Sequence, residues 1–206
     1  MKKILFQGDS ITDVGRSYEN NSDMGHGYPT LTAARLGYEE AGEVEFFNRG
    51  ISGNRIVDVY ARIKSDIINL KPDVMSILIG VNDVWHEFAI QNGVDAEKYY
   101  KIYSMLVEEI KAELPDIKIL ILEPFVEKHT ATEEKYDAFR REVEKRAEKA
   151  KLIAEKYNLK FVPLQDKFDE ALNKAPVGFW TADGVHPTTA GHQIISNEWI
   201  KAYKSL

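Results

Sequence analysis

The chain has 206 residues, of which 44% are hydrophobic and 29% are charged, as expected for a globular protein with a sizeable core. Its formal net charge is −6 and no basic cluster interrupts the sequence, which argues against a nucleic-acid-binding surface. The absence of cysteine excludes disulfide bonds, a thiolate nucleophile and zinc sites built on cysteine.

The amino-terminal stretch MKKILFQGDS has two lysines followed by only three apolar residues. A secretory signal peptide carries an apolar region of roughly 7–15 residues, and a membrane-spanning helix needs roughly 20. We therefore expect a cytoplasmic protein with no membrane partner, folded as a single domain over residues 1–206.

Short apolar runs alternate along the chain with longer segments of helical periodicity. The predicted strands are residues 3–7, 43–48, 73–80, 118–124 and 159–163. The predicted helices are residues 28–37, 55–70, 95–114, 131–157, 165–174 and 187–204. This alternation predicts an α/β fold with a parallel sheet, and the nearly all-apolar strands fit a sheet that is covered on both faces.

Five strands of this kind favour a three-layer α/β/α sandwich with the flavodoxin-like strand order 2-1-3-4-5. In such sheets, ligands bind at the carboxyl ends of the strands. Polar, glycine-rich turns follow the first three strands, and another lies past the fifth. They are GDSITD (8–13), NRGISGN (48–54), GVNDVW (80–85) and DGVHP (183–187). The end of the fourth strand, EPF (123–125), has fewer side chains that could take part in a reaction.

Each of these turns has an ordinary structural explanation when it is taken alone. Ser10 and its neighbour Asp9 are typical helix-capping residues, and so is Asn82. Gly53 could serve only to allow a tight turn, and His186 could be a surface histidine. None of these explanations accounts for the occurrence of all four turns at the same predicted edge of the sheet.

Together, the turns supply what serine-catalysed ester hydrolysis requires, which is a hydroxyl, a base, a group that orients the base, and donors for the oxyanion. Ser10 offers the hydroxyl. Asp183 and His186 are three residues apart, so one turn can bring a carboxylate to the imidazole Nδ1 and leave Nε2 for Ser10. The expected oxyanion donors are the Ser10 N–H, the Gly53 N–H and the Asn82 side-chain amide.

The same four segments resemble the sequence blocks of the SGNH (GDSL) hydrolases, in the family's order and spread over residues 8–187. The resemblance implies Ser10 as nucleophile, Gly53 and Asn82 in the oxyanion hole, and His186 with Asp183 completing the triad. We expect neither a metal nor a cofactor. The longer runs NRGISGN, KPDVMSILIGVNDVW and DGVHPTTAGH are similar to the branch that contains bacterial acetylxylan esterases and related carbohydrate deacetylases. This similarity implies an esterase that removes acetyl groups from sugars such as xylo-oligosaccharides through an acyl-enzyme intermediate.

The expected partner is therefore a small acylated carbohydrate, and the residues expected to contact it are Asp9, Asn54, Trp85 and Trp180. The two tryptophans flank the third and fourth blocks, where an aromatic face could stack on a sugar ring, although either could equally be a core residue. Asp9 has capping as its simpler role. No long apolar stretch suggests a lid or an acyl-chain tunnel, which favours a short acyl group.

The sequence is compatible with two alternative functions. One keeps the triad and changes the substrate, which gives a thioesterase or a lysophospholipase. The other is a non-catalytic carbohydrate-binding domain in which the polar turns serve only as caps. The histidines other than His186 lack the spacing of metal ligands, so we do not expect a zinc hydrolase. The charged helix predicted over residues 131–157 is either a solvated face or the interface of a homo-oligomer.

Overall fold

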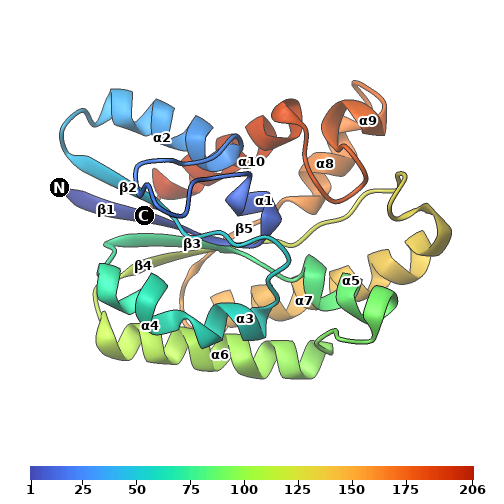
Figure 1. Cartoon of the computed structure of the whole chain (residues 1–206), viewed down its shortest axis with the longest axis horizontal. Helices are drawn as coiled ribbons and strands as arrows, with labels where there is room; N and C mark the ends of the chain where they lie inside the picture. Colours follow the sequence, from blue (N-terminus) through green and yellow to red (C-terminus); the bar gives the residue numbers. More distant parts are fainter.

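A five-stranded parallel sheet in the order β2-β1-β3-β4-β5 forms the middle layer of the computed structural model, which describes residues 1–206 (Figure 1). The strands are β1 (Lys2–Gly8), β2 (Val44–Asn48), β3 (Val74–Leu78), β4 (Lys118–Leu122) and β5 (Lys160–Val162). The expected α/β/α fold and strand order are confirmed.

Helices cover both faces of this sheet (Figure 1). On one side lie α2 (Tyr28–Glu39), α8 (Gln165–Ala171), α9 (Val177–Trp180) and α10 (Thr189–Tyr203). On the other lie α3 (Ile56–Ala61), α4 (Ile63–Asp66), α5 (Val81–Ile90), α6 (Ala96–Glu113) and α7 (Tyr136–Lys156). None of these helices combines the length and hydrophobicity needed to cross a lipid bilayer.

The core is divided in two by the sheet, because successive side chains of a strand point to opposite faces. In β1, Ile4 and Phe6 belong to the cluster that contains Trp199 of α10, whereas Leu5 belongs to the cluster that contains Tyr103 of α6. Strands buried on both faces are rigid supports, so the loops at their carboxyl ends start from fixed positions.

The helix predicted over residues 55–70 is interrupted at Arg62, where the backbone leaves the helical conformation between α3 and α4, and it ends in a 3₁₀ turn, η1 (Ile68–Leu70). The Arg62 guanidinium donates to the carbonyl oxygens of Gly8 (3.2 Å) and Arg49 (2.7 Å) and to the Asn54 side chain (2.8 Å). Arg62 therefore ties together the loops that follow β1 and β2.

The segment GVNDVW, expected to be a turn, begins a helix instead. Gly80, which has φ of +136°, lies in the short connection from β3 to α5, and α5 starts at Val81. Asn82 and Trp85 are three residues apart in this helix and consequently lie on neighbouring parts of one face. The helix predicted from residue 131 begins as a 3₁₀ turn, η2 (Glu133–Lys135), which runs into α7.

Candidate active site

Ser10 and His186, which are 176 residues apart, meet at the carboxyl edge of the sheet. The Ser10 Oγ lies 2.9 Å from His186 Nε2, and His186 Nδ1 lies 2.7 Å from Asp183 Oδ2. The structure thus joins the three side chains in the order that the sequence predicted. They lie at the edge of the sheet where α1 (Ser10–Asp13) and α5 begin (Figure 1).

Asp9 determines how Ser10 is presented. The Asp9 side chain caps α1 by accepting the Ile11 N–H at 3.0 Å, so Ser10 becomes the first residue of a short helix. Asp9 is only 1% exposed, and its second carboxyl oxygen has no hydrogen-bond partner. Burial raises the pKa of Asp9 to about 7 against the opposing effects of the Ile11 N–H and His186. This burial argues against the substrate contact expected for Asp9 and leaves it the capping role.

The Asp183 carboxylate shapes the turn that carries His186. One oxygen accepts the backbone N–H groups of Val185 (2.9 Å) and His186 (2.8 Å), and the other faces the imidazole Nδ1. Burial alone would raise the pKa of Asp183, but the hydrogen bonds from the His186 ring and from these backbone groups lower it to about 2. An ionised Asp183 favours the neutral imidazole tautomer that has its proton on Nδ1 and its lone pair on Nε2, facing Ser10.

Three donors suited to an oxyanion lie around Ser10, one on α1, one on the loop after β2 and one on α5. Asn82 Nδ2 donates to the Asn54 carbonyl oxygen at 3.2 Å, which leaves the second N–H of the amide unused by the chain. The Gly53 residue has φ of +80°, and its N–H bonds to no other residue. The Ser10 N–H belongs to the first turn of α1, where backbone N–H groups have no partner within the helix.

The loop after β2 is fastened to the loop after β1 by side chains from both. Asp13 accepts the N–H (2.9 Å) and the hydroxyl (2.8 Å) of Ser52, and Asn48 donates to the Thr12 carbonyl. Gly50 passes so close that an added Cβ would lie 2.3 Å from the Asp13 nitrogen. Only a glycine fits this crossing, so the two loops keep a fixed spacing.

Asn54 serves this same framework. Its side-chain oxygen accepts from Arg62, and its carbonyl oxygen orients the Asn82 amide. These bonds give Asn54 a positioning role that the sequence analysis did not anticipate. Its expected contact with a substrate stays a prediction.

The loop after β4, to which the sequence analysis gave little weight, holds the turn that carries Asp183. The Glu127 N–H donates to the Gly184 carbonyl oxygen (2.7 Å), and the Ala131 N–H donates to the Asp183 carbonyl oxygen (3.0 Å). Gly184 has φ of +102°, and a Cβ there would lie 2.5 Å from the Glu127 carbonyl oxygen. The glycine after Asp183 was the one available signal of this close contact.

A buried polar network anchors the β4 loop in turn. The Gln165 side chain accepts the Val126 N–H (3.0 Å) and donates to the Glu127 carboxylate (2.9 Å). Arg140 donates to the Val126 carbonyl oxygen and pairs with Asp169 at 2.9 Å. Burial and the nearby Asp169 charge raise the pKa of Glu127 to about 7. Residues of α7 and α8 thereby reach the Asp183 turn through the β4 loop.

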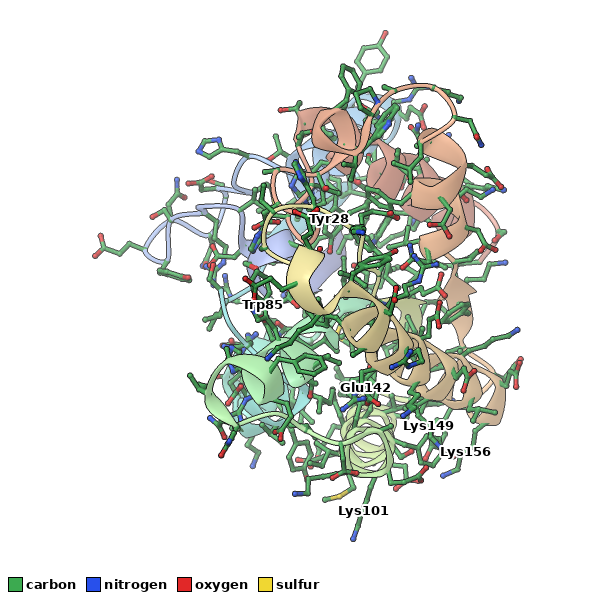
Figure 2. All side chains as sticks on the ribbon, turned by 90° about the vertical axis from the view of Figure 1, so that its right-hand side faces the viewer. Tyr28, Trp85, Lys101, Glu142, Lys149 and Lys156 are labelled. Carbon is green, nitrogen blue, oxygen red and sulfur yellow. The ribbon has the colours of Figure 1, made fainter.

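Trp85 of α5 is the aromatic residue that lies beside the candidate site. Its ring centroid is 5.8 Å from that of His186 and 6.1 Å from that of Phe139 in α7. Figure 2, in which the right-hand side of Figure 1 is turned toward the viewer, shows Trp85 between α5 and the start of α7. Beside it is a hollow of about 220 Å³.

Two other aromatic residues are directed elsewhere. The Trp180 indole N–H donates to the Ala175 carbonyl oxygen at 3.1 Å, and its ring borders a separate depression with residues of α8 and α10. This placement argues against the substrate contact expected for Trp180, because the short helix α9 turns the ring toward α10. Tyr28 is fully buried, with its hydroxyl against Thr12 (3.0 Å), and belongs to the core.

The buried His192 has a packing role as well. Its Nδ1 accepts the Tyr28 N–H at 3.2 Å, and burial lowers its pKa to about 4, so the ring is neutral near pH 7.

No group of three or more His, Asp or Glu side chains has an arrangement that could hold a metal ion.

Comparisons with known proteins agree with this geometry. Residues 6–194 match the model of the GDSL-like Lipase/Acylhydrolase family. The chain is 34% identical to an acetylxylan esterase of Geobacillus stearothermophilus over an alignment of 208 positions, which covers 97% of this chain and 93% of the relative.

Solved structures give the same picture. A candidate GDSL-like lipase of Parabacteroides merdae has a TM-score of 0.94 at 37% identity, covering 98% of this chain and 95% of that one. The crystal structure of an acetylxylan esterase from Geobacillus stearothermophilus has a TM-score of 0.86 at 34% identity, covering 98% and 93%. The chain therefore belongs to the GDSL-like lipase/acylhydrolase family and is a serine-dependent carboxylic ester hydrolase.

Proposed function

We propose that the protein removes acetyl groups from xylo-oligosaccharides, with Ser10 as nucleophile, His186 as general base and acid, and Asp183 as the group that orients His186. The observation that carries this proposal is the continuous hydrogen-bonded line from Ser10 Oγ through His186 to Asp183. The acetyl and xylan specificity is supported by the similarity to the acetylxylan esterase of Geobacillus stearothermophilus.

In the first half of the reaction, Ser10 Oγ attacks the ester carbonyl carbon while His186 Nε2 takes the hydroxyl proton. The carbonyl oxygen becomes an oxyanion that accepts hydrogen bonds from the Ser10 and Gly53 N–H groups and the Asn82 amide. Collapse of the tetrahedral intermediate breaks the bond to the sugar oxygen, which receives the proton from His186 and leaves as an alcohol. The acetyl group remains on Ser10.

In the second half, His186 removes a proton from a water molecule that attacks the acetyl carbonyl carbon, and the same donors bind the new oxyanion. Collapse returns the proton to Ser10 Oγ and releases acetic acid. Asp183 stabilises the imidazolium that forms in each half and keeps its Nε2 directed at Ser10. Trp85, next to His186, is proposed to contact the sugar on the side where the alcohol leaves.

Replacing the nucleophile tests the central assignment. In Ser10→Ala, we expect hydrolysis of p-nitrophenyl acetate to fall by about 10³-fold or more. The fold should persist, because the capping bond between Asp9 and Ile11 does not involve the Ser10 hydroxyl. A fluorophosphonate probe should label the wild type on Ser10 and leave the variant unlabelled. Retained hydrolysis by a variant with unchanged circular dichroism contradicts the mechanism.

The oxyanion assignment is tested at Asn82. Because Asn82→Ala removes one donor, kcat for p-nitrophenyl acetate should fall by about 10²–10³ with a much smaller change in KM. Asn173→Ala, at an exposed residue that follows α8, is the control and should have wild-type kinetics. An unchanged kcat in Asn82→Ala removes this side chain from the oxyanion site.

The pH dependence tests the pairing of Asp183 with His186. The hydrogen bond to Asp183 raises the pKa of His186 above 6.5 against the opposing effect of burial. Since only the neutral ring accepts the Ser10 proton, kcat/KM should fall as the pH drops through this raised pKa. In Asp183→Asn, the acidic limb of the profile should move to lower pH, and kcat should fall by about 10³–10⁴. An acidic limb that stays in place or moves upward contradicts the pairing.

The support that the β4 loop gives to the Asp183 turn is tested with two glycines. Gly184→Ala places a Cβ against the Glu127 carbonyl oxygen, and the resulting displacement of the turn should lower kcat by about 10–100-fold with little change in KM. Gly42 has φ of +79° but nothing within 4 Å, so Gly42→Ala is a control with similar backbone strain. It should cost about 1–2 kcal/mol of stability and leave kcat unchanged. Equal kcat values for the two variants contradict a positioning role for this contact.

A further inference from the structure

We propose that the hollow beside Trp85 is a sugar subsite, which binds the unit adjacent to the acetylated sugar in an oligosaccharide. This inference rests on the proposed function, whose chemistry it leaves unchanged. The hollow has a volume of about 220 Å³ and is lined by residues of α5, of the β4 loop and of the start of α7, namely Trp85, Phe88, Ala89, Thr130, Ala131, Thr132, Glu134, Lys135 and Phe139.

Its position relative to His186 places it on the side of the departing alcohol. His186 Nε2 protonates the sugar oxygen, so the sugar lies against the imidazole, and the Trp85 ring centroid is 5.8 Å from that of the imidazole. The lining includes Trp85 but neither Ser10 nor His186. A ligand in the hollow is therefore separated from the reacting ester by one aromatic side chain, a position that suits a neighbouring sugar unit.

The aromatic lining suits the C–H face of a sugar ring. Trp85 meets Phe139 at 64° and His186 at 46°, and Phe88 meets Phe139 at 79°. Both contacts of Trp85 are edge-on or tilted, so no aromatic ring stacks in parallel on its indole, and a pyranose could make that contact. Trp85 and Phe88 are both partly exposed.

Polar groups of the hollow suit a neutral, hydroxyl-bearing ligand. Thr130, Glu134 and Lys135 supply both donors and acceptors, and the Lys135 ammonium lies 5.7 Å from the centre of the Phe88 ring. One acid and one base leave the lining without net charge, which gives no attraction for the phosphates of an acyl-CoA. Drug-sized ligands occupy pockets of roughly 300–1,000 Å³, so the smaller hollow fits a single ring better than a long acyl chain.

The test is the dependence of the wild-type protein's kcat/KM on chain length, using mono-acetylated xylose and mono-acetylated xylotriose. We expect the wild type to prefer the trisaccharide. The ratio of the two kcat/KM values should fall by about three- to tenfold in Phe88→Ala, which removes part of the aromatic lining. It should fall similarly in Ala89→Met, which fills the hollow from an exposed position and so does not depend on repacking a buried side chain.

Ile90→Ala is the matched control, because Ile90 ends the same helix, is 65% exposed and lies outside the hollow. Its ratio should equal that of the wild type. A wild type with no preference for the trisaccharide, or Phe88 and Ala89 variants with the wild-type ratio, overturns the subsite and leaves the proposed esterase function intact. Failure to hydrolyse either acetylated sugar, with p-nitrophenyl acetate still cleaved, overturns both.

Discussion

The Asp183 carboxylate accepts two backbone N–H groups with one oxygen and faces the His186 ring with the other. The same charge therefore folds the turn and orients the side chain that the turn presents. Hydrogen bonds from a ring and from two fixed backbone groups outweigh the cost of partial burial, which is why the carboxyl group remains ionised. The geometry around Ser10 depends on this arrangement, because His186 reaches the hydroxyl only from a turn of this shape.

The sheet supplies the second constraint, which is a fixed distance between loops. β1 pairs with both β2 and β3, so Ser10, Gly53 and Asn82 follow adjacent strands, with Ser10 in α1, Gly53 in the loop after β2 and Asn82 at the start of α5. Arg62 and Asn48 then add hydrogen bonds to backbone carbonyl groups at the end of β1 and in the segments that follow β1 and β2. Hydrogen bonds of this kind bury polar backbone at little cost and limit its movement. Donors for an oxyanion need this fixed geometry, because they act without rearranging during the reaction.

The sequence was most informative where local patterns determine the outcome. Apolar runs located all five strands, and turns at strand ends located Ser10, Asn82 and His186 at the correct edge. It was least informative where a side chain is directed by distant packing. The break at Arg62 depends on carbonyl groups at the end of β1 and in the loop after β2, and the direction of Trp180 depends on α10. The support from Glu127 and Ala131 runs through backbone groups, so Gly184 is the one residue whose identity marks it in the sequence.

The loop after β4 contacts both the turn that carries Asp183 and the hollow beside Trp85. Ala131 donates to the Asp183 carbonyl oxygen and also lines the hollow beside Trp85, whereas Glu134 and Lys135 line the hollow without a hydrogen bond to the Asp183 turn. The residues that line only the hollow are therefore suitable positions for protein engineering. A segment grafted from a relative after Thr132, together with exposed positions near the end of α5, could change substrate range without disturbing the reactive side chains. The same separation offers evolution a route by which related enzymes diversify their preferences while retaining one chemistry.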